Sequence, residues 1–498
     1  MNFYVLTLLK FALLMFIYMT TLAYVQWIER KVLAHIQLRP GPNRVGPHGL
    51  LQPLSDVIKL VTKEGFIPSH VNKFFYLLAP VLAVATALIP ISMIPFGGQI
   101  DVPAFSTPVG DVSAFSTFAQ MTDVNVGVIA ILAITSLGVY GIALAGWASN
   151  NKYSLLGGLR SSAQMISYEL PMGIALACPL LLANSLSMRE IVNTQAGFQW
   201  GFIPNWAIFH GWATPVLMIS FLIYTIASFA ETNRIPFDLP EAENELVAGY
   251  HTEYSSMNFA AFFMAEYANM ITVSSIATLL FLGGWHPLWP AEYGSDYLVP
   301  LLFAISGGIM LYHGFNPARE RDKISLPAFG IIFLALAAGM LVPFLRPALM
   351  PIIWFTLKVF IILFIFIWIR GTLPRFRYDQ LGDPADARSP DSLPPAEQHH
   401  AQQFQRAALE VIHQAAHLGD RRYQPFAYHG LEQLFLVGEV EVKGSLGDAG
   451  AGCDVFKARA GIAALDEQLE RRSGDFLGPG VLAARPAWLG FGGGRHGK

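Results

Sequence analysis

The dominant pattern along the chain is a series of long apolar runs separated by shorter polar connections. A helix needs about 20 residues to cross the roughly 30 Å hydrocarbon layer of a membrane. Nine runs come near that length, at residues 3–25, 74–95, 125–147, 163–184, 213–230, 258–282, 298–313, 326–345 and 350–369. The run at 298–313 is short and glycine-rich, so it and the next run are alternatively one span plus a re-entrant piece. The expected fold is therefore all-α, a polytopic transmembrane bundle of eight or nine spans.

Lysine and arginine are unevenly distributed over the connections between these runs. Residues 26–73, 148–162, 231–257, 314–325 and 370–377 carry sixteen basic residues, whereas the alternate connections carry only Arg189 and Arg346. Basic connections are retained on the cytoplasmic side of a membrane. With nine spans, this asymmetry predicts that the N-terminus lies outside and that the connection 231–257 lies inside. The first run is too long for a signal-peptide core and is interpreted as a retained anchor.

The first long connection contains an amphipathic pattern of its own. In "GLLQPLSDVIKLVTKEGFIP" the apolar residues recur at helical spacing, and Asp56, Lys59 and Lys63 fall elsewhere on the helical wheel. The apolar positions are Leu50, Leu51, Leu54, Val57, Ile58 and Val61. This pattern predicts a helix that lies on the membrane surface.

Composition supports a membrane protein and excludes several other classes. Of 498 residues, 53% are hydrophobic and only 13% are charged, which is unusual for a soluble domain. The two cysteines, Cys178 and Cys453, cannot form a disulfide framework or hold an iron–sulfur cluster from this chain alone. Redox centres are therefore expected in partner chains, and no metal site is expected here. The net charge of −3, without a basic tract interleaved with aromatic residues, argues against nucleic-acid binding.

The character of the sequence changes after Leu381. Residues 382–498 contain no apolar run of membrane length, and their composition predicts a soluble, poorly ordered tail of a fused or frameshifted kind. His413 and His417 are four residues apart, which is a metal-ligand spacing, but no third ligand stands nearby and a surface helix is the favoured interpretation. The expected domains are thus a membrane domain at 1–381 and an atypical tail at 382–498.

Carboxylates are concentrated in "AETNRIPFDLPEAENELVAGYHTEYS", residues 230–255, where Arg234 is the only fixed positive charge. Asp238 followed by Glu241 resembles a capping box, in which both acids satisfy free amides at a helix start. Glu243, Glu245 and Glu253 have no such structural task. Because like charges beside a low-dielectric membrane raise one another's pKa values, we interpret the stretch as a proton-handling cluster.

Four ionisable residues fall within or near the ends of predicted spans. An ionised side chain inside a membrane is costly, so Glu169 and Glu266 are functional candidates by default. The structural alternative is that each carboxyl lies near a cytoplasmic helix end and hydrogen-bonds a neighbouring helix. Lys10 and Lys358 raise the same question, and Lys10 can extend toward a membrane surface.

Six segments of the chain resemble a known family. They are "WIERKVLAHIQLRPGPNRVGP", "LLQPLSDVIKL", "GWASNNKYSLLGGLRSSAQMISYELP", the acidic stretch above, "FFMAEYANM" and "IWIRGTLPRFRYDQL". In this order, over residues 1–381, they closely resemble the quinone-site membrane subunits of respiratory complex I. This family comprises the H-type subunits of bacterial NADH-quinone oxidoreductase and mitochondrial subunit 1.

The resemblance implies a function that depends on a larger assembly. Members of this family hold no redox centre, and flavin mononucleotide and iron–sulfur clusters belong to partner subunits of the hydrophilic arm. The chain is expected to form the entrance and lower wall of a quinone chamber and to couple quinone reduction to proton translocation. It is further expected in a bacterial cell inner membrane, beside small membrane subunits and lipid, with quinone as substrate.

The same resemblance assigns residues by motif. Those matched to the quinone chamber are Glu29, Arg30, Arg39, Arg234, Phe237 and Phe263. Those matched to the proton path are Glu169, Asp238, Glu241, Glu243, Glu245, Glu253 and Glu266. None of them is expected to be a chemical catalyst, since their work is electrostatic.

The chain departs from the family in three places, and two other functions remain open. A further span normally follows "RFRYDQL", and the connections 96–124 and 286–325 are longer than usual. An equivalent subunit of a membrane-bound hydrogenase or related ion-pumping dehydrogenase is one alternative. A stand-alone secondary transporter is the other, although no inverted repeat of broken helices is evident.

Overall fold

The computed structural model describes residues 3–102, 105–107, 110–112, 115–241, 243–315, 322–342 and 345–376. Within these ranges nine helices are long and apolar enough to cross a membrane. They occupy Thr7–Ile36, Lys73–Ser92, Gly127–Ala148, Lys152–Ala183, Thr214–Glu231, Ser256–Phe281, Ser295–Phe315, Lys323–Leu341 and Arg346–Thr372. The all-α prediction is confirmed, and the seventh and eighth runs are two separate helices. The predicted tail at 382–498, with His413, His417 and Cys453, lies outside the described residues.

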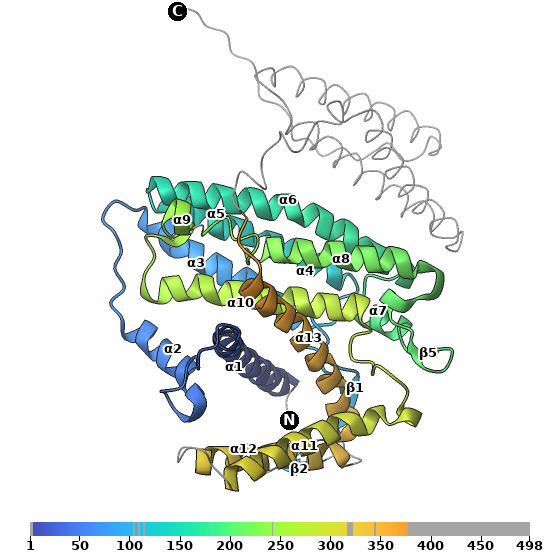
Figure 1. Cartoon of the computed structure of the whole chain (residues 1–498). Coiled ribbons are helices and arrows are strands. Elements are labelled where there is room, and N and C mark those ends of the chain that lie inside the picture. The colour runs from blue at the N-terminus through green and yellow to red at the C-terminus, as the bar shows by residue number, and fades with distance from the viewer. Residues whose placement is uncertain are drawn as a thin grey trace, which may run out of the picture. The chain divides into compact units, whose positions relative to one another are not determined.

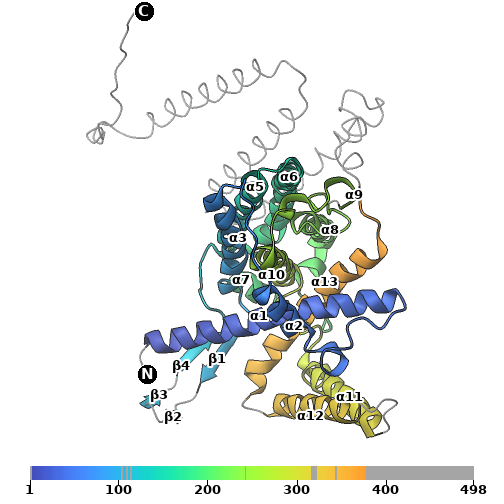
Figure 2. The same ribbon diagram turned by 90° about the vertical axis from the view of Figure 1, so that its left-hand side faces the viewer.

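The helices form a main bundle and a separate hairpin (Figures 1 and 2). In the bundle α3 (Lys73–Leu88), α5 (Gly138–Ala148), α6 (Lys152–Ala183), α8 (Thr214–Glu231) and α10 (Ser256–Phe281) pack side by side. Helices α1 (Phe3–Ile36) and α13 (Arg346–Thr372) cross this bundle obliquely and contact α10. The hairpin of α11 (Ser295–Phe315) and α12 (Asp322–Leu341) packs mainly on itself and meets α13.

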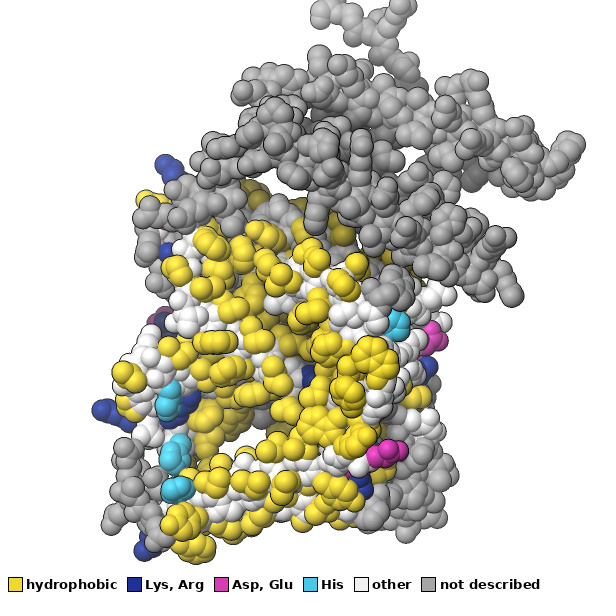
Figure 3. All heavy atoms as spheres, turned by 45° about the vertical axis from the view of Figure 1, so that its right-hand side comes forward, with side chains coloured by type: hydrophobic (Ala, Val, Ile, Leu, Met, Phe, Trp, Pro, Cys, Tyr) yellow, Lys and Arg dark blue, Asp and Glu magenta, His cyan; other side chains and the backbone are white. Residues whose placement is uncertain are grey.

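Burial distinguishes the centre of the bundle from its periphery. In the most apolar 18-residue stretch of α10, 61% is buried within the protein, compared with 17% in the corresponding stretch of α1. Figure 3 shows apolar side chains covering much of one outer face of the helices. A surface of this kind suits hydrocarbon rather than water.

Two helices extend well beyond their apolar runs. Helix α1 continues through "WIERKVLAHI" to Ile36, and α6 begins at Lys152, eleven residues before the predicted span. Asn151 caps α6, because its side-chain oxygen accepts a 3.0 Å hydrogen bond from the Tyr153 amide. Helical hydrogen bonding needs no apolar side chain, so hydropathy alone misplaced both boundaries.

The third span is interrupted between α4 (Gly127–Ser136) and α5 at Leu137. The hydroxyls of Thr135 and Ser136 donate back to carbonyls of the preceding turn at 3.0–3.1 Å. Such back-bonding beside a glycine, here Gly138, bends a helix. The hydrophobic pattern could not reveal this break.

The predicted surface helix is present as α2 (Gln52–Thr62). Its apolar positions Leu54, Val57, Ile58 and Val61 are 49–59% exposed, so the rest of the chain leaves this face uncovered. An uncovered apolar stripe next to membrane-length helices fits a position in the lipid interface.

Short strands, which the sequence analysis did not predict, form three two-stranded ribbons within the described connections. The first ribbon pairs β1 (Gln99–Val102) with β4 (Phe115–Phe118), and the second pairs β2 (Phe105–Thr107) with β3 (Gly110–Val112). The third pairs β5 (Phe198–Gln199) with β6 (Ile203–Pro204). The first two ribbons account for the length of the connection 96–124, which folds back on itself. They do not change the helical fold class.

The acidic stretch keeps one half of the expected capping box, because the Asp238 carboxylate accepts a hydrogen bond from the Glu241 backbone amide, but only a short helical turn follows it in the described part of the stretch. Beyond the end of α8 at Glu231, the only α-helical turn described in this stretch is α9 (Glu243–Leu246), and Asp238 lies five residues before it. The chain reverses at Gly249, which has φ +61° and lies directly against the Pro240 carbonyl. This tight reversal leaves no room for a longer helix starting at Pro240.

Candidate functional site

Glu29 is the centre of a buried group of polar side chains. It lies near the end of α1 and is only 3% exposed. The Tyr267 hydroxyl of α10 donates a 2.7 Å hydrogen bond to its Oε2. The Arg370 guanidinium of α13 donates to Oε1, and Arg234 Nη1 lies 3.5 Å from the same oxygen. One carboxylate therefore joins three helices and the start of the acidic stretch, and we call these four residues the Glu29 cluster.

Arg234 connects the Glu29 cluster to a second acid. It is 6% exposed, and its Nη2 lies 3.7 Å from Glu266 Oε2. Its Cζ stands 4.4 Å from the centre of the Tyr267 ring, a cation–π arrangement. Two guanidinium groups, of Arg234 and Arg370, thus face two carboxylates, of Glu29 and Glu266. Removing any one of these charges would leave an opposite charge without its partner in a largely buried place, which is strongly destabilising.

Some N–H donors of the Arg234 guanidinium have no acceptor among the described residues. Its Nε and Nη2 have no hydrogen-bond partner in the described part of the chain. Both ion contacts, at 3.5 and 3.7 Å, are longer than a direct charge-assisted hydrogen bond. The guanidinium therefore has spare donors at a point where a polar ligand group or a water could accept them.

The acids of residues 230–255 do not gather in one place. Glu245 Oε2 accepts a 2.6 Å hydrogen bond from Arg160 on α6, in a partly exposed pair. Glu253 Oε1 accepts a 2.6 Å hydrogen bond from Asn151, the cap of α6. Each thus has its own partner on α6 or at its start. The side chain of Glu243 lies outside the described part of the structure.

Asp238 and Glu241 lie deeper than Glu245. Arg375 Nη1 is 3.7 Å from Asp238 Oδ2, and His251 Nδ1 is 3.9 Å from Glu241 Oε1. Burial, and then the charge of Glu241, raise the pKa of Asp238 to about 7, although Arg375 and Arg234 oppose the shift. Burial lowers the pKa of His251 to about 4, so the imidazole is neutral near pH 7. Asp238 therefore titrates close to neutral pH.

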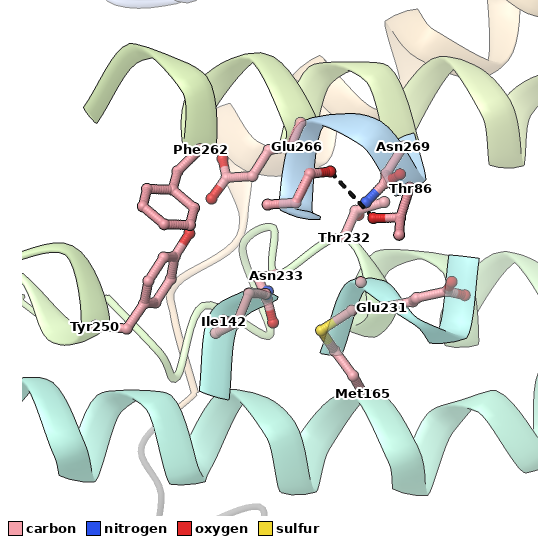
Figure 4. A pocket seen from close by; sticks show the side chains of 13 residues that line it. Thr86, Ile142, Met165, Glu231, Thr232, Asn233, Tyr250, Phe262, Glu266 and Asn269 are labelled. Atoms are coloured by element: carbon pink, nitrogen blue, oxygen red, sulfur yellow. Dashed lines mark hydrogen bonds between the residues drawn. The ribbon is translucent and has the colours of Figure 1, made fainter. Parts of the chain in front are cut away.

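A small cavity of about 20 Å³ lies between α3, α5, α6, α8 and α10 (Figure 4). Glu266 and Asn269 line it from α10, with Glu231 and Met165 on the opposite side. Glu231 Oε2 and Asn269 Oδ1 are buried and have no partner within the described residues. The volume suffices for a water molecule, which needs polar partners of this kind.

Glu231 is a site residue that the sequence analysis missed. It is 8% exposed at the last turn of α8. It was counted within the connection 231–257 and the acidic stretch, but it was assigned no role of its own. Glu169 of α6 lies beside the Ser136 hydroxyl at the α4–α5 break and is near enough to Glu231 for their charges to interact. Three intramembrane acids therefore border the same region.

Four further residues were matched to the quinone chamber. One of them, Phe237, lies beside the Glu29 cluster, and the other three lie apart from it. Phe237 is buried, with ring centres 5.5 Å from Tyr168 and 5.6 Å from Phe376, and it lies beside the Glu29 cluster through the Arg234 turn. Arg30 instead pairs with Asp56 of α2 at 2.7 Å, on the surface.

Phe263 and Arg39 also lie apart from the cluster. Phe263 packs on Phe259 and His251, with ring centres 4.6 and 5.9 Å away. Arg39 is exposed and donates to Gln37 at 2.7 Å. Arg30 is therefore on the α2 side of the molecule, and Arg39 lies just past the end of α1, so neither belongs to the Glu29 cluster. Among the described residues, no group of three or more His, Cys, Asp or Glu side chains is arranged to hold a metal.

Comparison with known proteins agrees with the membrane architecture. The NADH dehydrogenase family profile matches residues 9–384. An H-type subunit of NADH-quinone oxidoreductase from Solibacter usitatus is 63% identical over 380 residues, 76% of this chain and 92% of the relative. The H-type subunit from Koribacter versatilis is 50% identical over 379 residues, 76% and 91% of the two chains. One from Geobacter sulfurreducens is 43% identical over 380 residues, 76% and 89%. The chain is therefore a multi-pass membrane protein of the NADH dehydrogenase family, an H-type subunit of the NADH-quinone oxidoreductase known as respiratory complex I.

Proposed function

We propose that this chain forms the membrane wall and entrance of a quinone chamber in the assembled enzyme. The observation that carries the proposal is the charge balance of the largely buried Glu29, Arg234 and Glu266 with the partly exposed Arg370. Glu29, Glu266 and Arg370 lie on α1, α10 and α13, and Arg234 lies in the connection after α8. The amphipathic helix α2 contacts both α1 and α10. A quinone arriving from the lipid would meet α2 first.

The Glu29 cluster supplies position and charge rather than electron transfer. Two cysteines cannot hold an iron–sulfur cluster, so electrons come from flavin and iron–sulfur centres of partner subunits. Quinone reduction takes up protons together with electrons, and this changes the charge next to the chamber. Arg234, held between Glu29 and Glu266 by long contacts, can then strengthen one ion pair as it weakens the other.

The proton path begins where Arg234 touches Glu266. From Glu266 the cavity of Figure 4 leads past Asn269 to Glu231, and Glu169 lies beyond it. Asp238, with a pKa of about 7, provides an exchangeable proton at the start of the acidic stretch. The other acids of the stretch, Glu241, Glu243, Glu245 and Glu253, are assigned to the same path by their positions in the sequence. The path is oriented with the acidic stretch inside and the N-terminus outside a bacterial inner membrane.

The experiment compares carboxylate-to-amide variants in membranes that contain the whole complex. Glu266→Gln and Glu231→Gln retain shape but remove a titratable charge, so we expect quinone reduction and proton uptake to slow together. NADH oxidation by an artificial acceptor, which bypasses the quinone, should remain at the wild-type rate. Glu169→Gln, Glu245→Gln and Glu253→Gln complete the series. Wild-type rates of quinone reduction and proton uptake in all five variants would refute the proton path.

A further inference from the structure

Lys358 is a buried cation that the proposed function leaves unexplained. It lies within α13 and is 5% exposed. Its Nζ donates to three backbone carbonyl oxygens, of Leu282 at 2.6 Å, Gly284 at 2.8 Å and His286 at 2.7 Å. The Trp206 ring lies 4.1 Å from the nitrogen and completes its surroundings.

The number of acceptors indicates the protonation state of this amine. An ammonium has three N–H donors, whereas a neutral amine has two, so three carbonyl contacts match the charged form. The carbonyls lie just past Phe281, the last residue of α10, where the helix dipole concentrates negative potential. The face of an indole further favours a cation. The surroundings of Lys358 are therefore built for a fixed positive charge.

The carbonyls are themselves held rigidly in place. Gly283 and Gly284 adopt φ +69° and +52°, in the left-handed region that favours glycine. Gly283 packs against the Trp206 ring and Gly284 against Val192, too closely for a side chain at either position. The Gly283 amide also donates a 3.0 Å hydrogen bond to Gln195 Oε1. The turn after α10 is thus a preformed cation site.

We propose that Lys358 is a positioning residue that fixes α13 along α10 and thereby sets Arg370 against Glu29. Arg370 lies twelve residues further along α13, about 18 Å at 1.5 Å per residue. No proline interrupts α13 after Pro351, and α10 contains neither glycine nor proline. A displacement of α13 at Lys358 is therefore carried along the helix to Arg370 and the Glu29 cluster. The inference rests on the proposed function, because that cluster serves the quinone site.

The first test uses Lys358→Met and Lys358→Arg in the assembled complex. Methionine keeps an unbranched stem but leaves three carbonyls without donors, whereas arginine keeps both charge and donors. We expect the methionine variant to raise the quinone KM by about tenfold, with a smaller change in kcat, and arginine to restore most of the loss. NADH oxidation by an artificial acceptor should be unchanged in both.

The second test asks whether the charge itself is required. Lys358→Ala leaves a space that n-propylammonium can fill, restoring an ammonium among the three carbonyls. We expect propylammonium to rescue quinone reduction in a saturable way in the alanine variant and not in wild type. Propan-1-ol, which is similar in shape but uncharged, is the control and should not rescue.

The outcomes separate this inference from the proposed function. A wild-type quinone KM in Lys358→Met, or equal rescue by propanol and propylammonium, would overturn the role of the charge. If Lys358→Met does not assemble, the yield of assembled complex becomes the measurement. Equal losses of yield in Lys358→Met and Lys358→Arg would then overturn the inference. A structure of the Lys358→Met complex in which Arg370 keeps its contact with Glu29 would also overturn the inference. Failure of the proposed function would appear instead as normal quinone kinetics when Glu29 itself is changed.

Discussion

The hydroxyl of Tyr267 on α10 and the carboxylate of Glu29 on α1 are joined by a 2.7 Å hydrogen bond in the protein interior. Because Arg370 and Arg234 approach the other oxygen of Glu29, this bond completes the set of donors around one buried charge. Removing one donor from a buried carboxylate leaves it partly unsatisfied.

Tyr267→Phe should therefore weaken the site without disturbing the fold. We expect a loss of about 1–3 kcal/mol in the stabilisation of ionised Glu29. If quinone reduction depends on that ionised form, its rate should fall by about 5- to 150-fold. Tyr18→Phe is the matched control, since Tyr18 also joins α1 to α10 but donates to the Ala268 carbonyl at 3.2 Å. Quinone reduction rates are measured on equal amounts of assembled complex. Equal losses in both variants would contradict a specific role for Tyr267.

Glu231→Gln tests the acid that the sequence analysis did not assign. Its Oε2 is buried without a partner among the described residues, beside a cavity of water size, so its proton can exchange with a water there. We expect proton uptake and quinone reduction to fall together by about tenfold or more, if the acid relays protons by acid–base transfer. Glu190→Gln on α7 (Met188–Thr194) is the control, because that carboxylate is at the surface and accepts a 2.5 Å hydrogen bond from Ser185. A Glu231 variant indistinguishable from the Glu190 variant would remove Glu231 from the path.

The helices were predictable for a simple physical reason. Spanning a hydrocarbon layer demands a long apolar run, so the number and order of the membrane helices follow directly from hydropathy. Their ends did not follow, because α1 and α6 continue into polar residues that hydropathy excludes. The ribbon of β1 and β4 was equally invisible, since it rests on backbone pairing between distant short segments.

The site was predictable residue by residue but not as an arrangement. Glu29, Arg234 and Glu266 were each singled out, yet their contacts depend on how α1 and α10 pack, which no local pattern encodes. Tyr267 was missed, although it directly follows Glu266 in "AEYANM" and a phenol in an apolar helix requires a partner. The partners of Glu245 and Glu253 on or beside α6 likewise reflect tertiary packing.

The pKa of Asp238 predicts a pH dependence of stability. Its pKa is raised to about 7, first by burial and then by Glu241, so the folded state binds this proton more tightly than the unfolded chain. The stabilisation is complete below about pH 4 and is lost as pH rises through about 7, by at most about 1.4 kcal/mol per pH unit.

Asp238→Asn keeps nearly the shape of the protonated side chain but cannot ionise. The loss of stability at rising pH should therefore be absent in this variant. The Tm of the complex is measured for both proteins between about pH 5 and about pH 8. The Tm of the wild type should fall more than that of the variant as the pH rises. The difference between the two proteins should therefore widen with pH in favour of the asparagine variant. Parallel pH profiles would show that Asp238 keeps one protonation state throughout this range.

The predicted orientation can be tested with single cysteines. Lys59→Cys on α2 should react only with reagents that reach the cytoplasm, and Phe202→Cys between β5 and β6 only with reagents outside, since basic residues mark the inner connections. Both positions are exposed. Labelling with a membrane-impermeant maleimide is compared in sealed and opened cells, with Cys178 and Cys453 replaced by alanine. Labelling of Lys59→Cys in sealed cells would reverse the topology.

The turn at Gly249 gives a prediction about the acidic stretch itself. A Cβ on Gly249 would overlap the Pro240 oxygen, and its φ of +61° is unfavourable for alanine. Gly249 also packs against Gly157 of α6, so the reversed chain cannot move away freely. Gly249→Ala should cost about 1–2 kcal/mol for the backbone conformation alone, and more for the overlap.

Gly173→Ala is the control for this substitution, because Gly173 lies within α6 with nothing near its Cβ position. There alanine should be neutral or stabilise by up to about 1 kcal/mol, since it favours the helix. The measurements are the yield of assembled complex and the rate of protease cleavage between residues 236 and 250. Gly249→Ala should lower the yield and speed cleavage, because the overlap forces the stretch that holds Asp238 and Glu241 out of its buried position. If both glycine variants behaved alike, the tight reversal at Gly249 would not be what holds these acids in place.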